Sequence, residues 1–228
     1  MKLNVRRTGL ALVFLGTTLG ALTACVPLVM GGAVVTGMVA ADRRTTGTVV
    51  EDEGIELRSG SRIRENLGER GHVNVTSYNR QVLLTGEVAS AQDKQLVEQI
   101  VSGVDNVRNI VNELAVMGNS TLTQRSSDSL VTGRVKAALV DARDLYSTAF
   151  KVTTERGTVY VMGRVTAREA ARATEVISAT SGVQKVVRIL ETISEDELAR
   201  MTASAWIWIV SAFVLANLPF VNQRVGGL

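Results

Sequence analysis

The chain has 228 residues, 46% of them hydrophobic, so it can form one or two globular domains and does not have the composition of a disordered protein. Lys2, Arg6 and Arg7 account for the formal net charge of +3, and the remaining residues are balanced in charge. This balance excludes nucleic acid as an expected partner. A single cysteine excludes an intrachain disulfide.

The first 24 residues have the three parts of a secretory signal peptide. A basic start is followed by an apolar stretch over 9–22 and by small residues that lead to Cys25. The sequence LTAC, which ends at Cys25, resembles the bacterial lipobox, in which the cysteine is lipidated and becomes the mature N-terminus. The alternative is an uncleaved transmembrane helix that continues through 26–40. We expect a lipoprotein signal peptide over 1–24 and lipidation of Cys25.

The residue after Cys25 is valine and not aspartate. By resemblance to enterobacterial lipoprotein sorting, this favours the outer membrane, with the protein anchored by lipid on the periplasmic face. Residues 42–53, DRRTTGTVVEDE, are polar. We therefore expect 25–53 to be a lipidated N-terminus and tether ahead of the first domain.

Two similar stretches lie 77 positions apart, which indicates that one structural unit is used twice. They are Val73–Val88, VNVTSYNRQVLLTGEV, and Phe150–Val165, FKVTTERGTVYVMGRV. In each stretch apolar and polar residues alternate on both sides of a short polar segment. This pattern predicts a β-hairpin in each copy.

The first copy is expected over 54–116. It begins with a weak helix over Ile55–Leu67, and the hairpin follows. The sequence Ser90–Asp93 is similar to a capping box and starts a second helix, which Gly103 ends. A third strand is predicted over Val107–Leu114.

Residues 117–127, MGNSTLTQRSS, are expected to be a linker, and the second copy is expected over 128–193. Asp128 or a neighbouring serine is predicted to cap its first helix. The apolar stripe of that helix is Val131, Val135, Ala138, Leu139 and Ala142. After the hairpin, Thr166–Glu169 forms a second capping box, and the last strand is predicted over Val186–Ile193.

Each copy therefore has the element order α-β-β-α-β. The expected fold class is α+β, with two tandem domains that each have a three-stranded sheet and two helices on one face of it. A domain of about 60 residues has a marginal core when it stands alone. We therefore expect the two copies to pack together or to lean on a partner.

These features resemble the BON domain family. The resemblance rests on the element order, the Val-x-Val-Thr hairpin, the glycine that ends the second strand and the Ser-Gly-Val before the last strand. Two such domains behind a lipobox are similar to the outer-membrane lipoproteins of this family over residues 10–193. The similarity is strongest in a few stretches, namely Arg44–Thr48, Ile55–Arg58, Val73–Leu84, Val152–Gly163 and Arg168–Ala170.

The resemblance implies an anionic phospholipid membrane as partner, bound by the first helix of the second domain. That helix corresponds to 128–142, and the expected lipid-binding residues are Leu130, Arg134 and Lys136. Leu130 stands where the family often has a tryptophan. The resemblance also implies support of outer-membrane integrity. The alternative is an adaptor without direct lipid recognition, which binds envelope or outer-membrane assembly proteins.

Residues 201–228 form an apolar tail outside this resemblance. Ala203–Phe220 contains 18 residues without a charge, the minimal length for a transmembrane helix. A docked amphiphilic tail is the second interpretation, and a fused or mis-framed segment is the third.

The sequence predicts no catalytic site, metal site or cofactor. His72 is the only histidine, and we expect it to be an exposed surface residue. Neither a GxxxxGK phosphate loop nor a GxSxG elbow is present. We therefore expect that the protein is not an enzyme.

Overall fold

The structure is a computed structural model that describes residues 42–204, 206–207, 210–211 and 214. The predicted signal peptide and Cys25 lie outside the described residues, as does most of the apolar tail. The described part of the tail is helical, and four of its apolar side chains are exposed: Trp206, Ile207, Val210 and Val214. Among the described residues, no helix has the length and apolar character needed to span a membrane.

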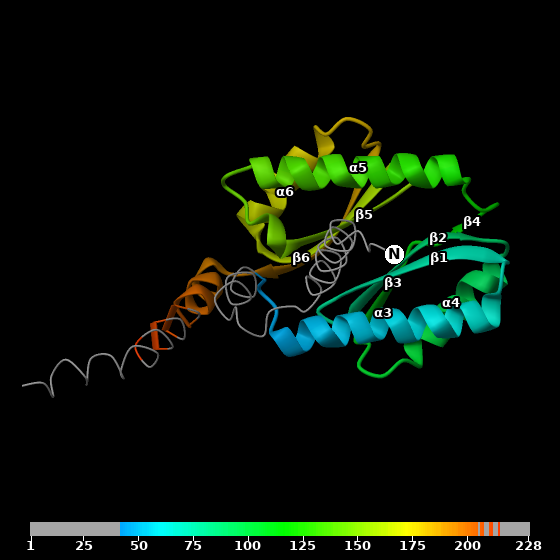
Figure 1. Cartoon of the computed structure of the whole chain (residues 1–228), viewed down its shortest axis with the longest axis horizontal. Helices are drawn as coiled ribbons and strands as arrows, with labels where there is room; N and C mark the ends of the chain where they lie inside the picture. The colour runs from blue at the N-terminus through cyan, green and yellow to red at the C-terminus, as the bar shows by residue number, and fades with distance from the viewer. Residues whose placement is uncertain (1–41, 205, 208–209, 212–213, 215–228) are drawn as a thin grey trace, which may run out of the picture. The chain divides into compact units, whose positions relative to one another are not determined.

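The first domain follows the expected order of elements (Figure 1). Its elements are α3 (Thr46–Leu67), β1 (Gly71–Tyr78), β2 (Gln81–Val88), α4 (Ala91–Ser102), β3 (Asn109–Asn112) and β4 (Ala115–Val116). The second domain repeats this order. Its elements are α5 (Leu122–Asp141), η2 (Ser147–Ala149), β5 (Phe150–Glu155), β6 (Thr158–Thr166), α6 (Ala167–Ser178) and β7 (Lys185–Ile193). The predicted α+β class with two tandem domains is confirmed.

Both predicted hairpins form. β1 pairs antiparallel with β2, and β5 with β6, while β3 and β7 pair parallel to the central strands β2 and β6. The two turns have positive φ at both central residues: 53° and 64° at Asn79 and Arg80, and 49° and 71° at Arg156 and Gly157. Such two-residue turns match the right-handed twist of the strands that they join.

The third strand of the first domain differs from the prediction of one strand over Val107–Leu114. It consists of two short pieces, β3 and β4, which both pair with β2. Between them Leu114 turns into the core, where it is 2% exposed, and its amide donates to the Asn112 side chain at 3.2 Å. This local turn divides the strand that pairs with β2 into two pieces. β7 has no such break over its nine residues.

The prediction that 42–53 is a tether and that the first helix starts at Ile55 was wrong. α3 begins at Thr46, and the Thr45 hydroxyl caps it by accepting a hydrogen bond from the Thr48 amide at 3.2 Å. Arg43, Arg44 and Asp52 tie this stretch to the fold, because each forms hydrogen bonds with a buried polar side chain. Asp52, for example, is 1% exposed.

The linker predicted over 117–127 is also shorter than expected. α5 begins at Leu122, capped by Thr121 and not by Asp128. Ser126 and Ser129 fit into the helix because each hydroxyl donates to the carbonyl four residues earlier, at 2.9 Å. The two predicted capping sites that start α4 and α6 are confirmed, at Ser90 and Thr166, and the second is a full capping box.

The helices of each domain cover one face of its sheet (Figure 1). They form two separate cores, one built around Ile55, Leu84 and Val97 and the other around Val135, Val161 and Ile177. The opposite sheet faces pack against each other. Tyr78 and Leu83 from the first domain form one buried cluster there with Tyr160, Met162 and Ile189 from the second. The expectation that the two copies pack together is confirmed.

Candidate lipid-binding surface

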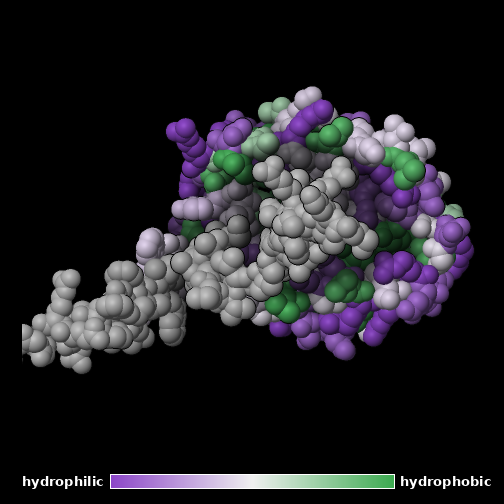
Figure 2. Space-filling model, viewed as in Figure 1, coloured by the Kyte–Doolittle hydropathy of each residue, from purple (hydrophilic) through white to green (hydrophobic). Residues whose placement is uncertain are grey.

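Helix α5 turns the predicted apolar stripe toward its own sheet. Val131, Val135 and Leu139 are at most 4% exposed, and they belong to the core of the second domain. The opposite side of α5 therefore faces outward along its length. Over the domain that carries α5, hydrophobic patches interrupt the hydrophilic surface (Figure 2).

Three large apolar side chains of α5 are exposed. Leu130 is 63% exposed, Leu122 is 78% and Val140 is 65%. The 3.6-residue periodicity of the helix places them on its outward side together with Gly133 and Ala137. We call these five residues the outward stripe. The sequence prediction included Leu130 but missed Leu122, because it placed Leu122 in the linker.

The two predicted basic residues lie on either side of the outward stripe. Arg134 and Lys136 are both exposed, and helical periodicity places them on opposite flanks of it. Arg134 donates to the Ser181 carbonyl at 3.4 Å. Within the described part of the chain, no hydrogen bond or ion pair holds Lys136. The structure thus brings the three predicted lipid-binding residues to one surface of one helix.

Charge distinguishes α5 from the corresponding helix of the first domain. α5 has three basic and two acidic residues, and one of the acidic residues, Asp128, is buried. α3 has three basic and five acidic residues. It exposes Val50 and Leu57, which are 64% and 73% exposed. Both helices therefore expose large apolar side chains, and they differ in their balance of basic and acidic residues.

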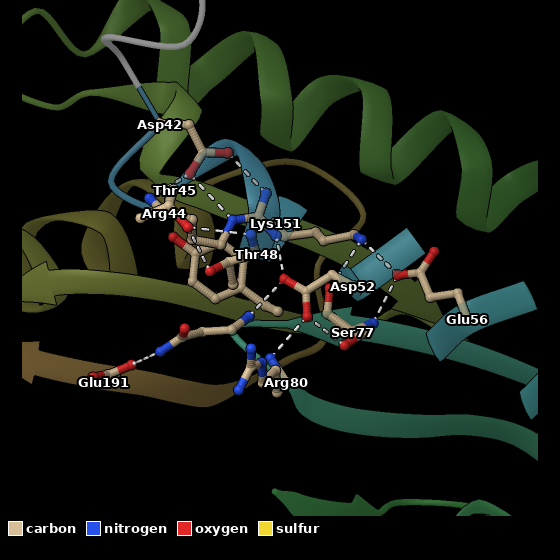
Figure 3. A network of polar contacts seen from close by, with 12 residues as sticks. Asp42, Arg44, Thr45, Thr48, Asp52, Glu56, Ser77, Arg80, Lys151 and Glu191 are labelled. Carbon is tan, nitrogen blue, oxygen red and sulfur yellow. Dashed lines mark hydrogen bonds and ion pairs between the residues drawn. The ribbon is translucent and has the colours of Figure 1, made fainter. Parts of the chain in front are cut away.

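Two buried aspartates support the hairpin turns, a role that the sequence analysis did not predict. Asp52 accepts hydrogen bonds from the Asn79 and Arg80 amides at 2.8 and 2.7 Å (Figure 3). Asp128, which together with a neighbouring serine is a candidate helix cap in the sequence, accepts from the Arg156 and Gly157 amides at 2.9 Å each. Each aspartate thus accepts hydrogen bonds from the two amides of a hairpin turn, which the turn itself does not satisfy.

His72 is half-buried and not exposed as predicted. Its Nδ1 lies 3.6 Å from the carboxylate of Glu87, and burial lowers the pKa of its imidazole. Burial also opposes ionisation of Glu87, but hydrogen bonds from Arg156 and Ser120 outweigh it and lower the pKa of Glu87. Within the described residues, no cluster of His, Cys, Asp and Glu side chains could hold a metal ion.

His72 also lines a cleft of about 260 Å³ between β1, β5 and α5. The buried Glu155 lies in this cleft and accepts a hydrogen bond from Asn74. Burial raises the pKa of Glu155, and the negative charges of Glu87 and Asp128 raise it further. The cleft therefore holds one carboxyl group that is poorly stabilised as an anion.

Comparison with known proteins identifies the family. The BON domain model matches residues 51–118 and 127–192. The outer membrane lipoprotein DolP of Haemophilus influenzae is 37% identical over 182 residues, which cover 78% of this chain and 93% of that protein. The 21 kDa hemolysin of Actinobacillus pleuropneumoniae is 30% identical over 154 residues, which cover 67% and 79%.

Among solved structures, the C-terminal domain of CdsD, a structural protein of the type III secretion system of Chlamydia trachomatis, is 12% identical with a TM-score of 0.27. The match covers 64% of this chain and 98% of that one. The two family matches and the DolP similarity agree with the repeat and with the two sheets described above. The chain therefore belongs to the BON domain family, carries two tandem BON domains, and is similar over most of its length to an outer-membrane lipoprotein.

Proposed function

We propose that this protein is a non-catalytic lipoprotein, anchored through Cys25 to the periplasmic face of the outer membrane. Its second BON domain contacts anionic phospholipid through α5, and this contact supports outer-membrane integrity. The similarity to DolP, an outer membrane lipoprotein, supports the compartment. The proposal of a lipid contact rests on the outward stripe of α5, which has Arg134 and Lys136 on its flanks.

The proposed contact is weak by itself. Each basic residue near an anionic surface contributes about 1 kcal/mol, and salt screens this contribution. Fully burying a leucine or valine contributes about 1.5–3 kcal/mol, but a shallow contact at the headgroup level gains only part of it. Lipidation of Cys25 would keep α5 close to the bilayer, so that a weak contact is sufficient.

A matched pair of double variants tests the proposal. Arg134→Glu with Lys136→Glu reverses both flanking charges on α5, whereas Arg62→Glu with Arg64→Glu does the same on α3. Arg62 is a close counterpart of Arg134. Arg134 donates to the Ser181 carbonyl, which follows α6, and Arg62 donates to the Gly103 carbonyl, which follows α4, at 2.7 Å.

The assay is sedimentation of residues 42–200 with anionic vesicles, accompanied by circular dichroism to check folding. We expect the α5 variant to lose binding and the α3 variant to bind like the wild type. Equal behaviour of the two variants would refute the lipid contact on α5. An adaptor for other envelope proteins would then be the better explanation of the paired domains.

A further inference from the structure

The four residues before α3, Asp42–Thr45, contact both domains. The side chains of Arg43 and Arg44 are only 7% and 10% exposed. Long basic side chains are almost never this buried unless they are paired. The partners of the two arginines therefore show what this segment does.

Arg44 fastens the segment to the first domain. Its Nη1 donates to the buried Asp52 of α3 at 2.8 Å, and its Nε and Nη2 donate to Asp42 at 3.1 and 2.8 Å (Figure 3). The guanidinium lies over the ring of Tyr78, 4.2 Å from its centroid. These contacts add a cation–π interaction to a hydrogen-bonded ion pair.

Arg43 reaches the second domain. Its Nη1 and Nη2 donate to the two carboxylate oxygens of Glu169 at 2.7 and 2.6 Å, and Nη1 also donates to the Arg164 carbonyl at 3.0 Å. Glu169 is 2% exposed and belongs to the capping box of α6. Burial opposes its ionisation, but the hydrogen bonds from Arg43 and Thr166 outweigh burial and lower the pKa of Glu169.

Two consecutive residues thus bind buried carboxylates in different domains. A bidentate pair between a guanidinium and a carboxylate fixes both distance and orientation. Removing one member of a buried pair leaves the other charge uncompensated, which is strongly unfavourable. If the segment detaches from either domain, a buried carboxylate of that domain loses its arginine partner.

We propose that Asp42–Thr45 is a clasp that locks the two BON domains together. Arg44 seats the clasp on the first domain, and Arg43 closes it on the second through Glu169. The clasp is independent of the proposed lipid contact on α5. Release of Arg43 therefore loosens the packing between the two sheets.

Trypsin provides a direct assay, because it cleaves after arginine and needs a locally unfolded substrate. The full chain in detergent micelles would be digested, and cleavage after Arg44 would be followed by mass spectrometry. We expect Arg43→Ala to accelerate this cleavage about tenfold or more over the wild type, since opening of the clasp then breaks fewer contacts. Arg43→Lys, which retains one ion pair without the bidentate geometry, should lie between them.

Arg168→Ala is the matched control, because Arg168 lies at the same end of α6 but pairs with the exposed Glu195 at 3.8 Å. It should be cleaved at the wild-type rate. In β5, the side chains of Lys151, Thr153 and Glu155 contact the first domain. Hydrogen exchange of residues 150–155 should therefore accelerate in Arg43→Ala alone. Wild-type cleavage of Arg43→Ala would overturn the proposal, and so would faster cleavage with unchanged exchange at 150–155.

Discussion

Replacement of Asp52 by alanine should destabilise the first domain strongly. The carboxylate is 1% exposed and accepts hydrogen bonds from the Asn79 amide, the Arg80 amide and the Ser77 hydroxyl at 2.7–2.8 Å. It also pairs with Arg44 at 2.8 Å. Alanine would leave two turn amides, a hydroxyl and a nearly buried guanidinium without this partner.

The magnitude follows from these contacts. Each hydrogen bond to a charged group contributes about 1.5–3 kcal/mol, but bonds to one carboxylate are not additive. Loss of one member of a buried ion pair typically costs about 3–5 kcal/mol, and we expect Asp52→Ala to fall in this range. Asp128→Ala removes two turn hydrogen bonds and, among the residues that the structure describes, no ion pair, so it should cost about 2–3 kcal/mol.

Urea unfolding of residues 42–200, followed by circular dichroism, would measure both free energies of unfolding. Asp52→Asn should recover part of the loss, because its amide oxygen can still accept from the turn. A cost below about 1 kcal/mol for Asp52→Ala would refute the reasoning, since that is the range of an ordinary exposed contact. If Asp128→Ala lowered the free energy of unfolding more than Asp52→Ala does, the comparison between the two turns would be refuted.

Because the pKa of Glu155 is raised, its contribution to stability is present below pH 4.5 and is lost as pH rises through the folded-state pKa. Glu155→Gln, which keeps an acceptor for Asn74, should therefore unfold at higher urea concentration than the wild type at pH 7, and a lower midpoint would contradict this. Cys25→Ala should leave a precursor without lipid, which mass spectrometry detects; a mature mass in this variant would show that the lipobox interpretation is wrong. Deletion of 201–228 should leave the stability of 42–200 unchanged in urea, and a sharp loss would show instead that the tail packs on the domains.

The sequence predicted the parts of the fold that local signals determine. Alternation of apolar and polar residues located both hairpins, and the Thr166–Glu169 spacing located the start of α6. The helical stripe of α5 gave the correct buried face, and so Leu130 could be placed outside. Each of these features depends on residues within one or two turns or strands.

Features that depend on distant partners could not be predicted. The Arg43–Glu169 pair joins residues 126 positions apart, and nothing in the sequence around either residue indicates the other. Residues 42–53 have the composition of a solvated tether. Contacts with distant residues make them part of the fold, such as those of Asp52 with the turn of the first hairpin and of Arg43 with Glu169. Leu122 was missed for a different, local reason, because the polar residues around it concealed the first turn of α5.

The most direct test of the proposed function is binding of unlipidated residues 42–200 to vesicles that differ only in lipid charge. The account predicts weak binding to anionic vesicles, a decrease as salt is raised, and no binding to zwitterionic vesicles, because Arg134 and Lys136 supply the attraction. Binding that ignores both salt and lipid charge, or no binding to anionic vesicles at low salt, would contradict it.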